Sequence, residues 1–424
     1  MTIDAGDTAW VLVSVALVFF MVPGLALFYG GLVRAKNVVG TMVQCFVALG
    51  VISVLWAVVG YSLVFGTDHA GLIGGFSHVL LRQVGGRPDA HAPTIPALAF
   101  MLFQMMFAVI TPALIAGAFA ERMRFRGYVM FIGLWSLVVY VPFAHWVWGG
   151  GFLGSGGLGA VDFAGGAVVH ETAGAAALAA ALYLGRRRHP VTRPYNLPMV
   201  LLGAGVLWFG WFGFNGGSAL SAGPVAATAV VNTQLGAATG MVVWMTVEWI
   251  RRRRPSGVGI ATGAVAGLAA VTPASGYVPP WAALVIGAAA GLACYVAVQL
   301  KGRLHYDDVL DVVGVHLVGG FVGVVLTGVF ASLAVNAAGA EGGWTQLGRQ
   351  AVLAVVGILY PFAATLLVLW VTDHLVGLRL SAEDEDVGLD ISQLSDDSGR
   401  DQDHIPSLQP PLPSRTDERG ESAA

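Results

Sequence analysis

Two histidines lie inside apolar stretches that should cross a lipid bilayer, and an imidazole can donate, accept or carry a proton. His170 lies in GGAVVHETAGAAALAAAL and His316 in VVGVHLVGGFVGVVLTGV. An ionisable side chain at the bilayer centre costs about 3 kcal/mol on insertion scales, so it usually lines a pathway. A single intramembrane histidine can also be a structural group with satisfied hydrogen bonds. Two of them, at matching points of two apparently related halves, predict a pore built around both.

The composition is that of a polytopic membrane protein. Hydrophobic residues make up 56% of the 424 residues and charged residues only 11%, which excludes an ordinary soluble domain. A helix needs about 20 apolar residues to cross the hydrocarbon core, so the sequence predicts an all-α fold with about eleven spans. Their expected limits are 9–32, 40–65, 96–120, 127–149, 165–185, 197–217, 226–250, 258–274, 281–300, 309–333 and 349–377.

The basic residues predict how these spans are oriented. The N-terminal MTIDAGDT lacks the basic start of a signal peptide, so we expect the first span to be retained with the N-terminus outside. Most of the 22 Lys and Arg residues, including Arg186–Arg188 and Arg251–Arg254, then fall on the cytoplasmic side, as short basic loops do. We therefore expect a multi-pass protein of the cell membrane whose C-terminus is cytoplasmic.

The eleven spans divide into two halves and one extra helix. Five spans precede the loop at 186–196 and five follow it, so the second half enters from the opposite face and any repeat is inverted. LFYGG at 27–31 ends the first span, as GFNGG at 213–217 ends the sixth. VVH at 168–170 similarly matches GVH at 314–316. These short matches favour a 5+5 inverted repeat with its pathway at the repeat interface.

The composition changes after about residue 380, which divides the chain into a transmembrane domain at 1–380 and a tail at 381–424. The tail begins with the acidic SAEDEDVGLDISQ and continues as a polar segment with four prolines. Such a composition predicts a cytoplasmic and largely disordered segment. A proline-rich docking motif is the alternative interpretation.

Several motifs together resemble the ammonium transporter family, Amt/Mep/Rh, of the bacterial Amt type. They are DFAGGAVVH at 162–170, FQMMFAVITPALIAGAFAERMRF at 103–125, HWVWGGG at 145–151, GWFGFNGGS at 210–218 and DDVLDVVGVH at 307–316. The resemblance runs from about residue 8 to about residue 392. It implies an eleven-helix homotrimer with a separate pore through each subunit, ammonium or methylammonium as substrate, and a role in nitrogen metabolism.

The resemblance assigns roles to aromatic residues at the outer end of the pore. Trp148 and Ser218 resemble the outer ammonium recruitment site, with Phe107 as its other aromatic wall. Aromatic faces attract a compact cation, and a serine hydroxyl can accept an N–H bond. Phe107 and Phe214 resemble the family's stacked gate. Taken alone, Trp148 would be an interfacial belt residue, Ser218 a packing serine, and the phenylalanines ordinary core.

Further residues match the pore and its supports. His170 and His316 resemble the family's twin histidines, which would titrate as a coupled pair. Asp162 precedes the fifth span, where a carboxylate can cap a helix, and the resemblance implies structural support of the recruitment site. Trp211 resembles a tryptophan beside the gate, and we interpret His145 as structural. The expected function is recruitment of ammonium, its deprotonation, and conduction of ammonia past the histidines.

Two departures from the family pattern stand out. Glu171 follows His170 where the family carries an apolar residue, and a buried charge there would need a partner. On a helix it points about 100° away from His170, which directs it toward a neighbouring helix or subunit. In the tail, GLDISQ matches the family but the following LSDD does not match His-Gly-Glu. This weakens the case for a PII-type signalling protein as a cytoplasmic partner.

Two other classes of function are alternatives to transport. A metal-dependent membrane enzyme is suggested by the adjacent His170 and Glu171, but the zinc motif requires histidine where Gly174 stands. We therefore expect no enzyme activity, no metal, no cofactor and no nucleic acid partner. A membrane ammonium sensor with little transport is the remaining alternative, although no signalling domain follows the spans.

Overall fold

The computed structural model describes residues 2–190 and 193–394, and these residues are mostly helical. Within them, ten helical segments are long and apolar enough to cross a membrane, and Gly257–Val271 is a shorter apolar helix. The ten are Ala5–Leu32, Ala35–Phe65, Ala97–Phe119, Phe125–Trp148, Gly166–Leu184, Leu197–Gly217, Pro224–Arg252, Pro280–Leu304, Val313–Phe330 and Trp344–Val376. Each of the eleven predicted spans thus corresponds to a helix, which confirms the all-α membrane fold.

Several spans are built from more than one helical piece. The helices are α1 (Ala5–Leu32), α2 (Val38–Leu55), α3 (Tyr61–Phe65), α4 (Ala97–Phe119), α5 (Phe125–Trp135), α6 (Val141–Trp148), α7 (Thr172–Leu184), α8 (Leu197–Gly217), α9 (Pro224–Arg252), α10 (Gly257–Val271), α11 (Pro280–Leu304), α12 (Val318–Phe330), α13 (Trp344–Val376), α14 (Ala382–Val387) and α15 (Leu389–Ser392). Short 3-10 turns are η1 (Ala35–Asn37) and η3 (Val79–Leu81), and π-helical turns are η2 (Trp56–Gly60), η4 (Ser136–Tyr140), η5 (Gly166–Glu171) and η6 (Val313–Leu317). Two small antiparallel hairpins pair β1 (Asp68–His69) with β2 (Ile73–Gly74), and β3 (Pro88–Asp89) with β4 (Ala92–Pro96).

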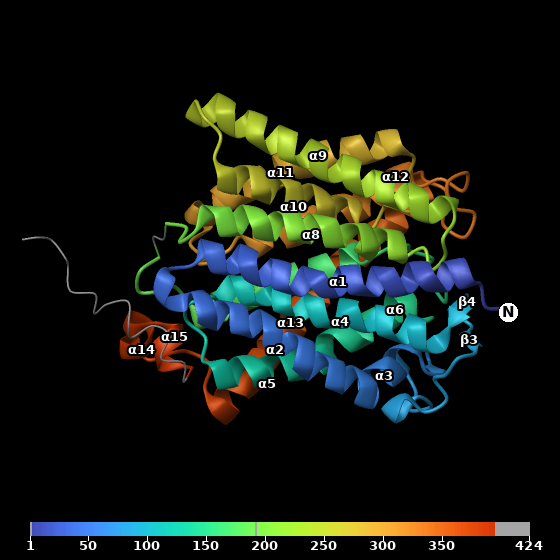
Figure 1. Cartoon of the computed structure of the whole chain (residues 1–424), viewed down its shortest axis with the longest axis horizontal. Coiled ribbons are helices and arrows are strands. Elements are labelled where there is room, and N and C mark those ends of the chain that lie inside the picture. The colour runs from blue at the N-terminus through green and yellow to red at the C-terminus, as the bar shows by residue number, and fades with distance from the viewer. Residues whose placement is uncertain (1, 191–192, 395–424) are drawn as a thin grey trace, which may run out of the picture.

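The long helices run side by side along one direction, so the molecule has two distinct ends (Figure 1). The N-terminus and the strands β3 and β4 lie at one end, and α14 and α15 lie at the other. We call the first the hairpin end and the second the basic end, because the arginine-bearing loops meet there. An odd number of passes places the start and the finish of the described chain at opposite ends.

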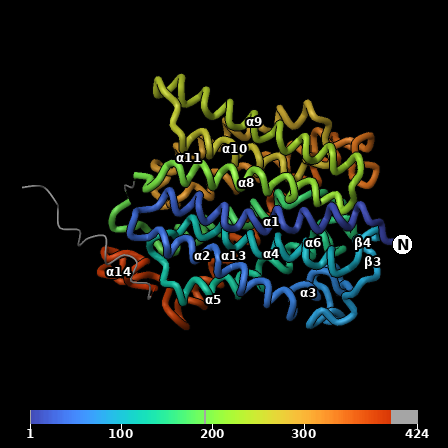
Figure 2. Tube along the Cα trace, in the orientation of Figure 1, coloured from blue at the N-terminus to red at the C-terminus, as the bar shows by residue number. Residues whose placement is uncertain are grey.

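The two halves pack around each other as an inverted repeat. The first helix of each half, α1 and α8, lie against each other along their length (Figure 2). A Cβ built on Gly174 would lie 2.6 Å from Cβ of Leu317, and one built on Gly320 would lie 3.0 Å from Cγ of Glu171. These two contacts are counterparts, because Gly174 stands four residues after His170 and Gly320 stands four residues after His316. The close approach requires glycine at both positions.

Side-chain caps define where several helices begin. The carboxylate of Asp4 accepts a hydrogen bond from the Asp7 amide at 2.9 Å, so α1 starts earlier than the predicted residue 9. The side chain of Asn196 accepts from Met199 N at the start of α8, and that of Ser256 accepts from Gly259 N at the start of α10. Each cap satisfies an amide that the helix itself leaves unpaired.

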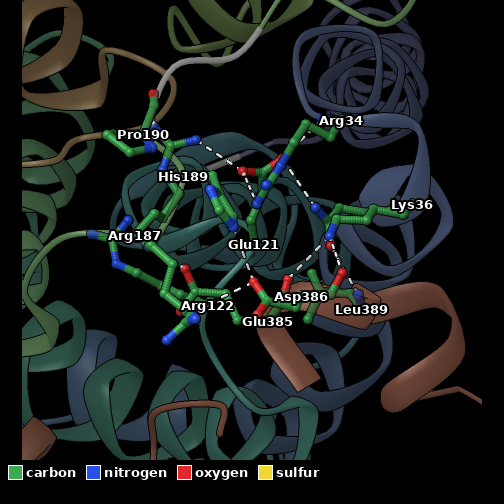
Figure 3. Close-up of polar contacts among 12 residues, drawn as sticks. Arg34, Lys36, Glu121, Arg122, Arg187, His189, Pro190, Glu385, Asp386 and Leu389 are labelled. Carbon is green, nitrogen blue, oxygen red and sulfur yellow. Dashed lines mark hydrogen bonds and ion pairs between the residues drawn. The ribbon is translucent and has the colours of Figure 1, made fainter. Parts of the chain in front are cut away.

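The first part of the expected tail is folded onto the basic end. Helices α14 and α15 pack near α2, where Asp390 accepts hydrogen bonds from Gly40 N at 2.7 Å and Val39 N at 3.2 Å. The Leu389 amide donates to Asn37 Oδ1 at 2.8 Å, and the Lys36 ammonium donates to the Asp386 carbonyl (Figure 3). The four prolines and the rest of the expected tail, 395–424, lie outside the described residues.

A buried ion network joins the loops at the basic end. Glu121 is fully buried and pairs with Arg34 at 3.0 Å and with Arg187 at 2.9 Å (Figure 3). Arg187 also reaches Asp307 at 2.9 Å. Burial alone would raise the pKa of Glu121, but the hydrogen bonds from Arg34 and the charge of Arg187 outweigh it and hold the pKa below its ordinary value. The network ties the ends of four separate spans together.

Candidate functional site

Two π-helical turns, η5 and η6, position His170 and His316 just before α7 and α12. Asp162 caps η5 by accepting hydrogen bonds from four successive amides, at 2.9 Å from Gly165, 2.7 Å from Gly166, 2.9 Å from Ala167 and 3.0 Å from Val168. This confirms the predicted cap. Burial raises the pKa of Asp162, although the four N–H bonds favour the ionised form. Asp308 serves the same purpose for η6, where it accepts from Val313 N at 2.8 Å.

The histidines meet in the interior of the bundle. Nδ1 of His316 lies 3.2 Å from Nδ1 of His170, and the two rings are stacked with centroids 5.2 Å apart and planes 23° apart. His170 is 1% exposed and His316 is 5% exposed. A hydrogen bond between like nitrogens requires one to donate and the other to accept, so the two rings must take complementary tautomers. The contact couples their proton states.

A narrow cavity runs beside the histidine pair. Its volume, measured as the space open to the centre of a water molecule, is about 20 Å³, which suits roughly one water-sized guest. Both histidines line it, together with the aromatic side chains of Trp211 and Phe214. Most of the remaining lining is aliphatic: Met21, Leu25, Ile110, Leu114, Val169, Leu207, Val265, Leu310 and Val315. A small apolar passage with two facing imidazoles favours a neutral guest over a hydrated ion.

Two phenylalanines separate this cavity from a wider one. Phe107 on α4 and Phe214 on α8 lie with ring centroids 4.4 Å apart and planes 41° apart, and each is 1% exposed. Phe214 lines the narrow cavity, whereas Phe107 lines the wider one. The structure thus brings together the two residues predicted to form a gate, and places them between two spaces.

The wider cavity, which we call the vestibule, has a volume of about 530 Å³ and lies on the hairpin-end side of the phenylalanines. Phe107, Trp148 and Ser218 all line it. The Trp148 indole stands edge-on to Phe107 at 5.9 Å and donates from Nε1 to the Asp162 carbonyl at 2.8 Å. The Ser218 hydroxyl donates to the Phe214 carbonyl at 2.8 Å, so its oxygen lone pairs remain available to accept.

Trp211, the residue expected beside the gate, has one partner that the sequence did not reveal. Trp211 stacks on His170 with ring centroids 5.4 Å apart, and its indole donates to the Thr272 hydroxyl at 2.9 Å. Nothing in the sequence marks Thr272, because a lone threonine in an apolar span usually bonds its own helix. His145 is buried away from the pore, between the Val64 carbonyl at 2.7 Å and Asp68 at 2.8 Å, which agrees with a structural histidine.

Gln104 is a second vestibule residue that sequence reasoning missed. It lines the vestibule one turn of α4 before Phe107, so it faces the same space. Its amide oxygen is an acceptor that an N–H cation could use. The only signal was its position in FQMMF, where a polar residue stands among apolar ones.

The Glu171 side chain is directed away from the two cavities. It is fully buried, and it is absent from the lining of both cavities described above. A Cβ built on Gly357 of α13 would collide with its Oε2 atom. The prediction that Glu171 is directed toward a neighbouring helix is confirmed.

The chain is similar to known ammonium transporters over most of its length. The sequence profile described as Ammonium Transporter Family matches residues 9–398. The ammonium transporter of Bacillus subtilis is 44% identical over 393 residues, which cover 91% of this chain and 96% of that protein. The ammonium transporter Amt1 of Archaeoglobus fulgidus is 45% identical over 393 residues, which cover 92% of this chain and 97% of that one.

Solved structures give the same result. The crystal structure of Saccharomyces cerevisiae Mep2 superimposes with a TM-score of 0.85 at 38% identity, and the match covers 90% of this chain and 89% of Mep2. A structure titled Sensor Amt Protein matches with the same TM-score at 30% identity, covering 92% of this chain and 98% of that one. Sequence and fold agree along almost the whole described chain, which therefore belongs to the ammonium transporter family.

Proposed function

We propose that the chain takes up ammonium at the vestibule, removes its proton at the phenylalanine gate, and conducts ammonia through the narrow cavity. One observation carries the proposal. The Phe107–Phe214 pair, with ring centroids 4.4 Å apart, separates a vestibule of about 530 Å³ from a cavity of about 20 Å³ beside the histidines. A cation is accommodated on one side of this boundary, and a small neutral molecule on the other.

The vestibule residues suit recruitment of ammonium. The faces of Trp148 and Phe107 attract a compact cation by about 0.5–2 kcal/mol. The Ser218 oxygen is free to accept one N–H bond, because its own proton is directed to the Phe214 carbonyl. Asp162 supports the site indirectly, since its backbone carbonyl holds the indole while its carboxylate caps η5. Ammonium thus gains cation–π and hydrogen-bond partners as it loses water.

The gate and cavity suit passage of ammonia and not of ammonium. An apolar constriction excludes hydrated ions because it offers no replacement for their water shell. Ammonium can cross by transferring its proton to water in the vestibule, which carries the proton back to the outer solution, whereas potassium, which is about as large, has no proton to lose. Beyond the gate, His170 and His316 present a donor and an acceptor to ammonia while their shared contact keeps both rings in place.

Uptake of labelled methylammonium by vesicles tests the role of the histidines. We expect His170→Ala to lower uptake by about tenfold or more, equivalent to about 1.4 kcal/mol of barrier. The control is His374→Ala, which removes an exposed histidine at the end of α13 that bonds only the Trp370 carbonyl among the described residues. Unchanged uptake in His170→Ala would remove the histidines from the mechanism.

Sensing is the second candidate, because the Sensor Amt Protein shares the fold at 30% identity. Transport is the better supported function, since the transporters of Bacillus subtilis and Archaeoglobus fulgidus are 44% and 45% identical to this chain. Growth rescue of a transporter-deficient host on low ammonium separates the two. A transporter restores growth, and a sensor with little transport does not.

The proposal includes an orientation and an assembly. The basic end faces the cytoplasm of the cell membrane and the hairpin end faces outside, as the positive-inside rule requires of the arginine-rich loops. The membrane domain covers residues 1–380, and 381–424 form a cytoplasmic tail. We propose a homotrimer with one pore in each subunit. A PII-type signalling protein is the candidate partner for the basic end.

A further inference from the structure

Glu171 is a buried carboxyl group with no partner in the described chain. Its side chain is 0% exposed, and neither Oε1 nor Oε2 has a hydrogen-bond partner among residues 2–190 and 193–394. No arginine, lysine or histidine of those residues forms an ion pair with it. An isolated carboxylate inside a bilayer is among the costliest groups a protein can bury. The group therefore requires an explanation.

Two other deeply buried glutamates have hydrogen-bond partners, unlike Glu171. Glu121 receives two guanidinium groups and the Asn37 amide. Glu248, 3% exposed, accepts from the backbone and hydroxyl of Ser256. The fold thus supplies hydrogen-bond donors to both of these glutamates, and supplies none to Glu171. This contrast indicates that Glu171 is held as the neutral acid.

The carboxyl group lies where three elements come closest together. Gly320 of α12 approaches its Cγ, and Gly357 of α13 leaves the space that its Oε2 occupies. The Phe143 ring of α6 reaches to 3.3 Å from the position of a Cβ on Gly357. These three neighbours offer no hydrogen-bonding side chain to the carboxyl group, which suits a neutral group.

The carboxylate of Asp162 caps η5 itself, and the other elements packed against this turn bring few charged groups of their own. Helices α4, α10 and α12 contain no Asp, Glu, Lys, Arg or His, and α7 offers only Tyr183 as a titratable group. Helix α6 brings His145, which Asp68 holds, and η6 brings His316, which faces His170. Helix α13 carries Tyr360, bonded to the Val138 carbonyl, and Arg349, Asp373 and His374 toward its ends. Arg349 stands eight residues from Gly357, about 12 Å along the helix.

We propose that Glu171 is an intramembrane proton-binding site, and that its bound proton keeps η5 packed against α13 and so holds the histidine pair in its conducting geometry. His170 is the preceding residue of the same π-helical turn. Loss of the proton leaves a carboxylate that must reach water or a cation, and its movement displaces the turn that fixes the 3.2 Å contact between the histidines. The Glu171 site thus regulates conduction in response to pH, and this role rests on the proposed function of the His170–His316 pair.

Infrared difference spectroscopy on the reconstituted full-length protein tests the proton site directly. The C=O stretch of a protonated carboxyl is compared at neutral pH in wild type, Glu171→Gln and Glu248→Gln. We expect one acid band that Glu171→Gln abolishes and Glu248→Gln retains. Glu171→Met, which is apolar and of similar length, replaces the amide variant if that variant fails to assemble. The absence of a Glu171-dependent acid band overturns the proposal.

The pH dependence of methylammonium uptake tests whether the Glu171 proton regulates conduction. At each pH, wild-type uptake is divided by the uptake of Glu171→Gln. As pH rises, this ratio should fall in parallel with the intensity of the Glu171 acid band. Where half of the band is lost, this ratio should have fallen about twofold, because only the protonated fraction conducts. Parallel pH profiles of uptake in the two proteins would refute the regulatory role of Glu171. If the wild-type protein shows no uptake, the proposed transport function is contradicted. The infrared band would still show whether Glu171 binds a proton.

Discussion

Nδ1 of His170 and Nδ1 of His316 lie 3.2 Å apart, although 146 residues separate them in the chain. The inverted repeat produces this contact, because each histidine occupies a π-helical turn that begins the fifth span of its half. The counterpart contacts of Gly174 with Leu317 and of Gly320 with Glu171 hold the two turns together. The geometry of the histidine pair therefore depends on how closely the two halves approach.

Replacement of the vestibule aromatic should weaken ammonium binding more than turnover. Trp148→Leu removes one of the two aromatic faces that line the vestibule beside the gate. Since a cation–π contact contributes about 0.5–2 kcal/mol, we expect KM for methylammonium to rise about two- to thirtyfold. The maximal rate should change less. Uptake measured over a range of concentrations checks this, with Trp249→Leu, an exposed tryptophan of α9, as the control.

Loss of the Asp162 cap should destabilise the fifth span. Four amides of η5 donate to this carboxylate, so Asp162→Ala leaves them buried without acceptors. We expect a loss of about 2 kcal/mol or more, given that removal of a single cap costs about 0.5–2 kcal/mol. The melting temperature of the purified protein measures the loss. Asp162→Asn, which keeps one acceptor oxygen, should recover part of it, and an alanine variant as stable as wild type would contradict the role.

The position of Glu171 predicts a steric conflict that a second substitution relieves. Gly357→Ala places a methyl group against Oε2 of Glu171, and such overpacking costs about 1–3 kcal/mol. We expect lower thermal stability and lower uptake. Adding Glu171→Ala removes the colliding group, so the double variant should be more stable than the sum of the two single effects predicts. Strict additivity would show that the two residues do not touch.

The ion network at the basic end predicts acid sensitivity. The pKa values of Glu121 and Asp307 lie below their ordinary values, since hydrogen bonds and charge from Arg34 and Arg187 outweigh burial. Groups with a lowered pKa in the folded state stabilise it above the unfolded pKa, about 4.3 for Glu and 3.9 for Asp, and this contribution is lost as pH falls through the folded values. Melting temperature should drop steeply below about pH 4. Glu121→Gln should be less stable at neutral pH and should lose less on acidification.

The sequence predicted features that depend on local residue patterns, and missed contacts between loops that are far apart in the chain. The spans followed from hydropathy, the Asp162 cap from its place before a span, and the orientation of Glu171 from helical geometry. The motifs at 103–125, 162–170, 210–218 and 307–316 supplied the expected site residues that line the two cavities. The π-helical form of the histidine turns has no signal in a single sequence, since side-chain composition alone does not distinguish it from an α-helix.

The basic-end network shows the limit most clearly. Glu121, Arg187 and Asp307 come from loops far apart in the chain, and only the packing of four spans brings them within 2.9 Å. For a similar reason, the sequence did not predict the helices α14 and α15 at the start of the tail. Its acidic composition predicts solvation, but Asp390 accepts hydrogen bonds from the amides of Val39 and Gly40 at the start of α2, where a helix N-terminus attracts a carboxylate.

Parallel uptake of labelled methylammonium and labelled rubidium in the same vesicles tests the central claim, that the passage beyond the gate admits only a guest that can lose a proton. Rubidium resembles potassium and cannot be deprotonated. The account predicts that wild-type vesicles accumulate methylammonium well above protein-free vesicles, while rubidium entry stays at the protein-free level. Rubidium entry through the wild-type protein at a rate close to that of methylammonium would contradict it.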